Sequence, residues 1–208
     1  MAIERFTAAL ICSFAKALTG VRAIWRGSEP LARQRIYFAN HTSHGDFVLI
    51  WATLPTALRR QTRPVARADY WQRGALRRFI AERVFRGVLI SPAAGRHHSL
   101  NPLAQMNLAL AQGDSLIVFP EGTRNPGEGV LPFKSGLYHL ARAHSEVEFI
   151  PVWIENLGRV MPKGALIPIP LLCTLCFGQS LEMRADESKT AFLERARASM
   201  LALAPPGE

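Results

Sequence analysis

The first part of the chain has a helical pattern of apolar residues. They recur at three- and four-residue spacing at Ile3, Phe6, Leu10, Phe14, Leu18, Val21 and Trp25. Basic residues interrupt the pattern at Arg5, Lys16 and Arg22. This spacing predicts an amphipathic helix that either packs on the body of the protein or lies in a membrane interface. The basic residues and the tryptophan near its end favour the interface, so we expect residues 1–27 to be a membrane-associating segment.

Short apolar runs alternate with helical patterns in the remaining domain, residues 28–208. Runs typical of strands lie at 35–39, 64–68, 87–91, 115–119, 149–154 and 172–177. Helical patterns lie at 47–54, 69–85, 102–112, 136–143 and 186–203. Asn101 followed by Pro102 is a favourable helix start. The alternation, without internal repeats, predicts an α/β fold: a single domain with a mostly parallel central sheet flanked by helices.

The composition fits a folded intracellular domain. Of its 208 residues, 49% are hydrophobic and 20% charged, which is too apolar for a disordered chain. Three cysteines exclude a disulfide scaffold, and no cleavable signal pattern is visible. No stretch resembles the roughly 20 apolar residues that span a bilayer. We therefore expect a peripheral or monotopic protein on the cytoplasmic face of the inner membrane.

The net charge of +9 is concentrated in one stretch, where ten arginines between residues 59 and 96 face only two acidic residues. Such a basic surface suits phosphate on a small substrate, anionic lipid or nucleic acid, or is simply a solvated face. Aromatic residues are not interleaved with the arginines, and no zinc-finger spacing or nucleic-acid module occurs. We therefore expect an anionic membrane surface, and not nucleic acid, as a partner.

One polar loop follows the strand predicted at 35–39. Its sequence is Asn40-His41-Thr42-Ser43-His44-Gly45-Asp46. Five steps along a straight helix leave two side chains about 140° apart, so His41 and Asp46 meet only if His41 lies on the turn before the helix. A histidine held by a carboxylate on one ring nitrogen can take a proton with the other.

Simpler interpretations of this loop stay open. An aspartate near a helix start is often a cap, and a lone histidine is often structural. His41, His44 and Asp46, with His97 and His98, also suggest a metal site, although their spacing fits no zinc signature.

A second loop follows the strand predicted at 115–119. Phe119-Pro120-Glu121-Gly122-Thr123-Arg124 places an acid and an arginine three residues apart across a glycine. The arginine fork suits bidentate phosphate binding, and the glutamate can hold a hydroxyl or orient the arginine. Taken alone, Glu121 and Arg124 are equally consistent with an ordinary surface ion pair.

Together the two loops resemble the glycerolipid acyltransferase family typified by 1-acyl-sn-glycerol-3-phosphate acyltransferase. Asn40, His41 and Asp46 match its Asn-His-x4-Asp block, and residues 119–124 match its Phe-Pro-Glu-Gly-Thr-Arg block letter for letter. Later similar segments are Phe133-Lys134-Ser135-Gly136, Ile150-Pro151-Val152-Trp153-Ile154 and Phe177-Gly178.

The resemblance implies transfer of a fatty acyl group from acyl-CoA or acyl carrier protein to the free hydroxyl of a lysophospholipid, with no metal or redox cofactor. The acceptor that it favours is 1-acyl-sn-glycerol-3-phosphate, which gives phosphatidic acid. His41 would be the general base and Asp46 its orienting partner. Glu121, Gly122 and Thr123 would shape the acceptor site, and Arg124 would bind its phosphate.

The chain departs from the family in one block. The strand that normally ends with an arginine at the acceptor phosphate reads Gly87-Val88-Leu89-Ile90-Ser91-Pro92, with a proline at about that position. Arg96 is our first candidate for the replacing cation and Arg86 the second.

Two other classes of protein stay open: a metal-dependent phosphoesterase using His41, His44 and Asp46, and a non-catalytic module that binds anionic membranes.

Overall fold

A seven-stranded sheet forms the centre of the protein in a computed structural model. The structure describes residues 2–43, 45–91, 101–125, 127, 129–156 and 172–205. The strand order is β1-β7-β6-β2-β5-β3-β4. The strands are β1 (Arg22–Trp25), β2 (Arg35–Ala39), β3 (Thr62–Arg67), β4 (Val88–Ile90), β5 (Ser115–Val118), β6 (Glu148–Glu155) and β7 (Thr174–Phe177). Strands β2 to β6 are parallel to one another, and β7 pairs antiparallel with β6 and parallel with β1. The mostly parallel sheet of the prediction is confirmed.

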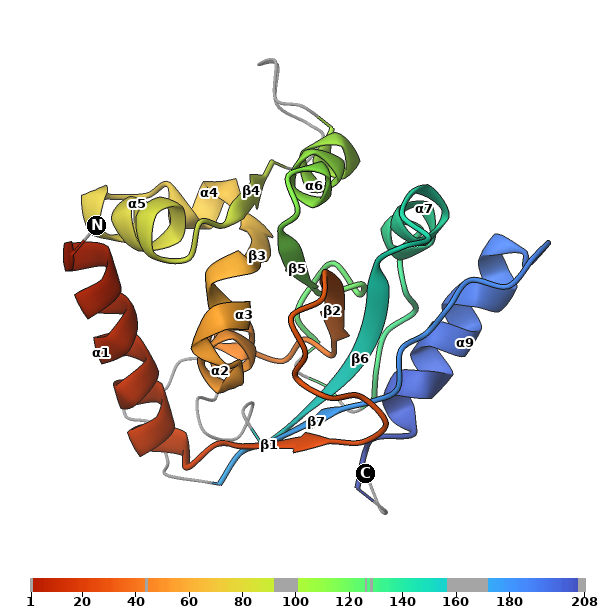
Figure 1. Cartoon of the computed structure of the whole chain (residues 1–208), viewed down its shortest axis with the longest axis horizontal. Coiled ribbons are helices and arrows are strands. Elements are labelled where there is room, and N and C mark those ends of the chain that lie inside the picture. Colours follow the sequence, from red (N-terminus) through yellow and green to blue (C-terminus); the bar gives the residue numbers. More distant parts are fainter. Residues whose placement is uncertain are drawn as a thin grey trace.

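Helices cover both faces of this sheet (Figure 1). One layer contains α1 (Ala2–Thr19), α2 (Asp46–Thr53), α3 (Thr56–Gln61) and a π-helical turn η1 (Ile80–Val84). The other layer contains α6 (Pro102–Ala111), α7 (Gly136–Ala143) and α9 (Lys189–Leu201). Successive side chains of β2 alternate between the layers, because Tyr37 packs with α2 while Phe38 packs with α7. The sheet therefore has two buried faces, as parallel sheets require.

The N-terminal helix is shorter than its apolar pattern predicts. Helix α1 ends at Thr19, and Gly20 follows with a φ of +52° that favours glycine. Trp25 lies in β1, where it pairs with Phe177 of β7 and stacks on its ring at 4.1 Å. The prediction of a helix extending to Trp25 is therefore wrong, because pairing with a strand some 150 residues later overrides the local pattern.

Helix α1 has apolar side chains on two faces. One face packs against α2 and buries Cys12, Ala15 and Thr19. The exposed face carries four large apolar side chains, which we call the α1 stripe: Ile3 (65% exposed), Phe6 (70%), Leu10 (59%) and Phe14 (65%). At about 100° per residue these four fall within a single arc of the helix. The helix thus both packs on the domain and presents an apolar surface to its surroundings.

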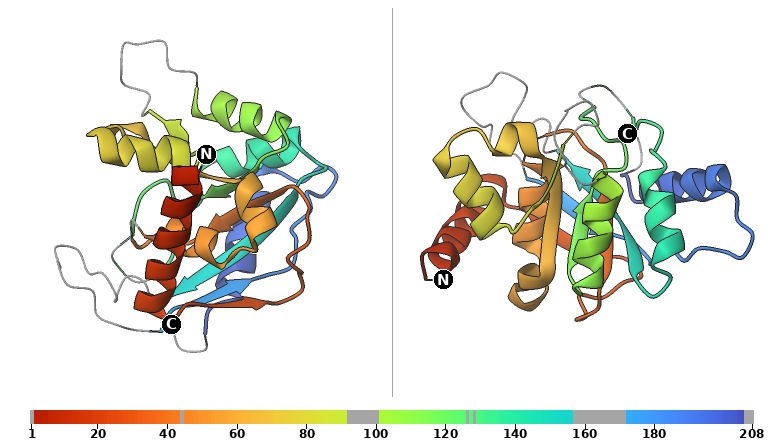
Figure 2. Two further views of the ribbon diagram at one scale, coloured as in Figure 1. Left: turned by 60° about the vertical axis from the view of Figure 1, so that its left-hand side comes forward. Right: turned by 90° about the horizontal axis from the view of Figure 1, so that it is seen from above.

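The basic stretch predicted as one helix at 69–85 is broken. It forms α4 (Ala68–Trp71), α5 (Ala75–Phe79) and η1. Gly74 separates α4 from α5 with a φ of +86°, a conformation that no helix interior contains. The break turns α5 away from the sheet, so that α5 projects from the edge of the molecule beside α1 (Figure 2).

Other local predictions are confirmed. The side chain of Asn101 accepts a hydrogen bond from the backbone N–H of Leu103 at 3.0 Å, and Pro102 begins α6. Helix α9 begins at Lys189, three residues later than expected, after a Ser188 cap. In the part of the chain that is described, no helix has both the length and the apolar character needed to cross a bilayer.

Candidate active site

The two motif loops meet at the carboxyl edge of the sheet. The first loop leaves β2 and the second leaves β5, and these strands are parallel neighbours. The backbone N–H of Asn125 donates to the carbonyl of His41 at 2.8 Å, which ties the loops together. The Asn40 side chain bridges to β6, donating to the carbonyl of Ile154 at 3.0 Å and accepting from its N–H at 2.8 Å. Two neighbouring strands therefore fix the turn that carries His41.

His41 and Asp46 form the contact that the sequence predicts. The Nδ1 atom of His41 lies 2.7 Å from Oδ2 of Asp46. Asp46 is the first residue of α2 and is completely buried, while the imidazole is 20% exposed. The same Oδ2 also accepts from the N–H groups of Thr42 at 2.7 Å and Ser43 at 2.9 Å. Asp46 therefore holds the loop and the imidazole at once, and Nε2 is the ring nitrogen of His41 that Asp46 does not contact.

Glu121 supports the histidine loop from the second motif. Its Oε1 accepts from the backbone N–H of His41 at 2.8 Å, and its Oε2 accepts from the N–H of Leu131 at 2.9 Å. The residue is only 3% exposed. Burial raises the pKa of this carboxyl, and the N–H donors of Leu131 and His41 oppose that shift. Glu121 is not among the lining residues of the adjacent cavity, so the structure gives it a supporting position behind His41.

The imidazole of His41 stacks on an aromatic ring. Phe119, the first residue after β5, lies with its ring centroid 4.1 Å from that of His41 at an angle of 18°. The stack fixes one face of the imidazole, while the contact with Asp46 fixes its edge. The ring therefore has a single well-defined orientation toward the cavity.

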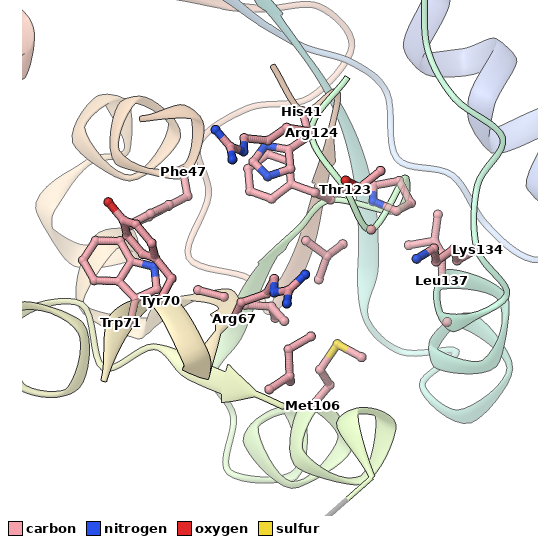
Figure 3. A pocket seen from close by; sticks show the side chains of 18 of the residues that line it. His41, Phe47, Arg67, Tyr70, Trp71, Met106, Thr123, Arg124, Lys134 and Leu137 are labelled. Atoms are coloured by element: carbon pink, nitrogen blue, oxygen red, sulfur yellow. The ribbon is translucent and has the colours of Figure 1, made fainter. Parts of the chain in front are cut away.

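A cavity of about 490 Å³ opens in front of His41 (Figure 3). Its basic lining residues are Arg67, Arg73, Arg124 and Lys134. Its apolar wall includes Val65, Ile90, Met106, Val118, Leu137 and Leu140. Figure 3 shows the side chain of Arg67 pointing into the cavity, with Arg124 beside His41 and Met106 on the opposite side. One volume thus offers cations near the imidazole and an apolar surface farther away.

The predicted site residues fall into four groups. His41, Gly122, Thr123 and Arg124 line the cavity, whereas Asp46 and Glu121 support it from behind. Arg86 is not brought to the cavity: its guanidinium binds Asp114, just before β5, at 3.2 Å and the carbonyl of Arg60 at 2.9 Å. That position is at the amino edge of the sheet, away from the cavity. Pro92 and Arg96 lie outside the described residues.

Three further cations line the cavity: Arg67 and Arg73, which belong to the basic stretch of residues 59–96, and Lys134, none of which the sequence assigns to the acceptor site. Arg67 ends β3, and its register partner is Ile90, the last residue of the neighbouring β4. Its guanidinium pairs with Asp69 at 2.7 Å. Lys134 packs closely against Gly122, since a Cβ atom on residue 122 would lie 2.6 Å from the Nζ atom of Lys134. Arg73 follows α4. The rule that ligands gather at the carboxyl ends of strands, applied to β3, would have found Arg67.

The sequence also leaves open a metal site that includes His41, His44 and Asp46. Within the described part of the chain, no group of three or more His, Cys, Asp and Glu side chains is placed to hold a metal ion. His44, His97 and His98 lie outside it. The carboxylate oxygen of Asp46 nearest His41 already accepts the three hydrogen bonds described above.

Comparison with known proteins agrees with the motifs. Residues 22–155 match the family model described as Acyltransferase. Mouse 1-acyl-sn-glycerol-3-phosphate acyltransferase alpha is 28% identical over 152 residues, which is 71% of this chain and 50% of that protein. The 1-acyl-sn-glycerol-3-phosphate acyltransferase of Limnanthes alba is 28% identical over 158 residues, 74% of this chain and 53% of that protein. The chain therefore spans about half the length of these curated relatives.

A solved structure has the same fold. The crystal structure of the 1-acyl-sn-glycerophosphate (LPA) acyltransferase PlsC from Thermotoga maritima superimposes with a TM-score of 0.71. The match covers 96% of this chain and 79% of that chain, at 22% sequence identity. This similarity supports the fold, and the family model covers well over half of the sequence. The chain belongs to the Acyltransferase family.

Proposed function

We propose that this protein transfers a fatty acyl group from a thioester to the free hydroxyl of a lysophospholipid, with 1-acyl-sn-glycerol-3-phosphate as the acceptor. The observation that carries the proposal is the buried Asp46 bound to Nδ1 of His41, with the imidazole facing a cavity lined by cations. A general base beside bound positive charge suits an acceptor that has both a hydroxyl and a phosphate. The relatives named above are 1-acylglycerol-phosphate acyltransferases, which agrees with this substrate class.

We propose a separate role for each ring nitrogen of His41. We assign the proton of His41 to Nδ1, which lies 2.7 Å from the Asp46 carboxylate, so that Nε2 serves as the base. Nε2 takes the proton of the acceptor hydroxyl as the oxygen attacks the thioester carbonyl carbon. The tetrahedral intermediate then collapses, the carbon–sulfur bond breaks, and the thiolate takes the proton from the imidazolium. The Asp46 carboxylate stabilises that imidazolium throughout.

The cations of the cavity supply the phosphate site. Arg124 follows the Glu121-Gly122-Thr123 turn and lies beside His41 (Figure 3). Arg67 reaches the same volume from β3, next to the strand whose family arginine is replaced by Pro92. We assign the acceptor phosphate to Arg124 and Arg67, with Lys134 completing the positive field. The apolar wall around Met106 and Leu137 suits an acyl chain.

The lipid substrate requires access to a membrane. The α1 stripe is an apolar surface without a partner among the described residues, and it belongs to the segment 1–27 predicted to associate with membranes. We propose that α1 lies in the interface of an anionic membrane, on its cytoplasmic face, and that residues 28–208 form the acyltransferase domain. The donor is acyl-CoA or acyl carrier protein, and both have a thioester of the same reactivity.

The test is a transfer assay with the purified full chain. Radiolabelled 1-acyl-sn-glycerol-3-phosphate is incubated with acyl-CoA or acyl carrier protein, with and without a chelator, and the lipids are separated. We expect diacyl product with at least one donor, unaffected by chelator, and none with His41→Ala. Release of inorganic phosphate that a chelator abolishes would indicate a metal-dependent phosphoesterase. Vesicle binding without any turnover would indicate a non-catalytic membrane module.

A panel of acceptors tests the headgroup. Equal amounts of lysophosphatidic acid, lysophosphatidylethanolamine and a monoacylglycerol are compared with the same donor. We expect lysophosphatidic acid to be acylated fastest because its phosphomonoester meets Arg67 and Arg124. Faster acylation of an acceptor without a phosphomonoester would overturn the phosphatidic acid assignment and leave only the broader acyltransferase one.

A further inference from the structure

The helix α5 presents an unusual surface. Leu76 is 70% exposed, and Arg73, Arg77 and Arg78 are exposed around it. We call these four residues the α5 patch. No acidic residue occurs between positions 71 and 80, so no neighbour in the sequence neutralises the patch. A large apolar side chain surrounded by arginines is typical of a surface that meets an anionic lipid interface.

The α5 patch lies next to α1. An ion pair of 3.2 Å joins Arg83 of η1, which directly continues α5, to Glu4 near the start of α1. In the views of Figures 1 and 2, α5 lies beside the N-terminal end of α1, at the same edge of the molecule. The α5 patch and the α1 stripe are therefore neighbouring exposed surfaces, with one large apolar side chain in the patch and four in the stripe.

The α5 patch is also continuous with the cavity. Arg73 and Tyr70 belong to the cavity lining. The guanidinium of Arg77 lies over the Tyr70 ring, 4.6 Å from its centroid. We call Arg73 and Tyr70 the rim of the cavity, because they join its lining to the α5 patch. A surface that binds α5 would consequently be in contact with this rim.

We propose that the α5 patch is a second membrane-contacting element, which orients the cavity toward the bilayer. Leu76 enters the interface of an anionic membrane while Arg77 and Arg78 bind lipid phosphates, so that the rim at Arg73 and Tyr70 lies at the lipid surface. The proposal rests on the proposed function in that it supplies a route for a lipid acceptor. An acidic carrier protein is the other partner that such a basic surface fits. The exposed Leu76 and the neighbouring α1 stripe favour lipid, because both need an apolar phase.

Insertion of position 76 can be measured directly. The three native cysteines, Cys12, Cys173 and Cys176, are buried, so a cysteine at position 76 can be labelled selectively. An environment-sensitive fluorophore on Leu76→Cys is mixed with substrate-free vesicles of phosphatidylglycerol and phosphatidylethanolamine. We expect a blue shift, and quenching by lipids that carry a quencher near the headgroup. The matched control is Leu108→Cys on α6, which is 54% exposed on the opposite face of the sheet and should not respond.

Flotation of full-length variants with the same vesicles measures the energetic contribution. Leu76→Ser with Arg78→Gln should weaken vesicle binding by about tenfold or more, because an interfacial arginine and a buried leucine each contribute several-fold. Leu108→Ser with Arg142→Gln, which changes an exposed leucine and an exposed arginine on the other layer, should have no effect. Binding to pure phosphatidylcholine should be weak for all proteins.

Two results would overturn the proposal. A label at position 76 that does not respond to vesicles, while one at Phe6→Cys does, would confine membrane contact to α1. Unchanged flotation of Leu76→Ser with Arg78→Gln, combined with a loss of turnover with acyl carrier protein alone, would assign the α5 patch to the carrier protein. Both binding measurements omit substrate. Failure of this proposal is thus distinguishable from failure of acyl transfer.

Discussion

The two walls of the cavity are built in different ways. The wall that contains His41 consists of buried, hydrogen-bonded loops, in which Asp46 and Glu121 are 0% and 3% exposed. The wall formed by β3, α4 and the following Arg73 presents exposed charged groups, and the side chains of the ion pair Arg67 and Asp69 are 62% and 43% exposed. A base must be held within a fraction of an ångström, whereas a binding surface for headgroups can adapt. Under the proposed function, the first wall performs the chemistry and the second binds the headgroup.

The largest expected effect is at the buried wall. His41→Ala should lower kcat by about 10²- to 10⁴-fold, because a lipid hydroxyl is a poor nucleophile at neutral pH without a base. Asp46→Asn should cost less, since the imidazole keeps its base nitrogen. Steady-state assays with circular dichroism as a folding control measure both. A His41→Ala protein that retains more than about a tenth of normal turnover would refute the role of His41 as the base.

At the exposed wall we expect changes in binding instead of turnover. Arg67→Ala should raise the KM for lysophosphatidic acid by about tenfold, the value of one charged hydrogen bond, with kcat little changed. Arg124→Ala, at the exposed end of the second motif loop, should act in the same direction, and lysine should rescue either variant only in part. The KM of the acyl donor should not move.

Arg86→Gln is the matched control for Arg67→Ala. Its guanidinium binds Asp114 at the other edge of the sheet, so the variant should lose some thermal stability and keep the acceptor KM. An equal rise of the KM in both variants would mean that overall charge, and not the position of Arg67, governs binding.

The same comparison explains what could be predicted from the sequence. The buried wall is made of contiguous motifs, so His41, Asp46 and the turn at Glu121 are visible in the sequence as short patterns. The cations around the cavity come from separate segments, and Arg67, Arg73 and Lys134 come together only through the strand order β2-β5-β3. Arg86 is close to the strand end in sequence, yet its side chain is bound at the opposite edge by Asp114.

The prediction of helices and strands from local patterns is limited in the same way. Helix starts such as Asn101-Pro102 depend on neighbouring residues and are predicted correctly. Trp25 continues a helical pattern, but its place is decided by Phe177, far along the chain. A single-sequence pattern contains no information on such a pairing.

A smaller effect on turnover is expected at Glu121, which supports the buried wall without lining the cavity. Glu121→Gln replaces one acceptor oxygen by an NH₂ group that faces a backbone N–H. We expect kcat to fall by about tenfold with the KM unchanged, because His41 is displaced slightly, and the free energy of unfolding to fall by about 1–3 kcal/mol. The control is Glu148→Gln. Glu148 is the first residue of β6 and forms an ion pair with Arg35, so this variant should lose stability and keep kcat. A Glu121→Gln protein that changes only the KM would place Glu121 at the acceptor.

The smallest predicted effect is the pH dependence of stability that Glu121 contributes. Burial raises the pKa of its carboxyl in the folded protein above the ordinary value of 4.5. Because the folded state then holds its proton more tightly than the unfolded state, the contribution of Glu121 to stability falls as pH rises from the ordinary pKa through the raised one. In Glu121→Gln no proton is exchanged, so the stability advantage of the wild type over this variant should shrink across that interval and stay constant above it. Urea unfolding of both proteins at a series of pH values measures the difference. An advantage that grows with pH over the same interval would mean that the N–H groups of His41 and Leu131 outweigh burial and that the folded-state pKa of Glu121 lies below 4.5.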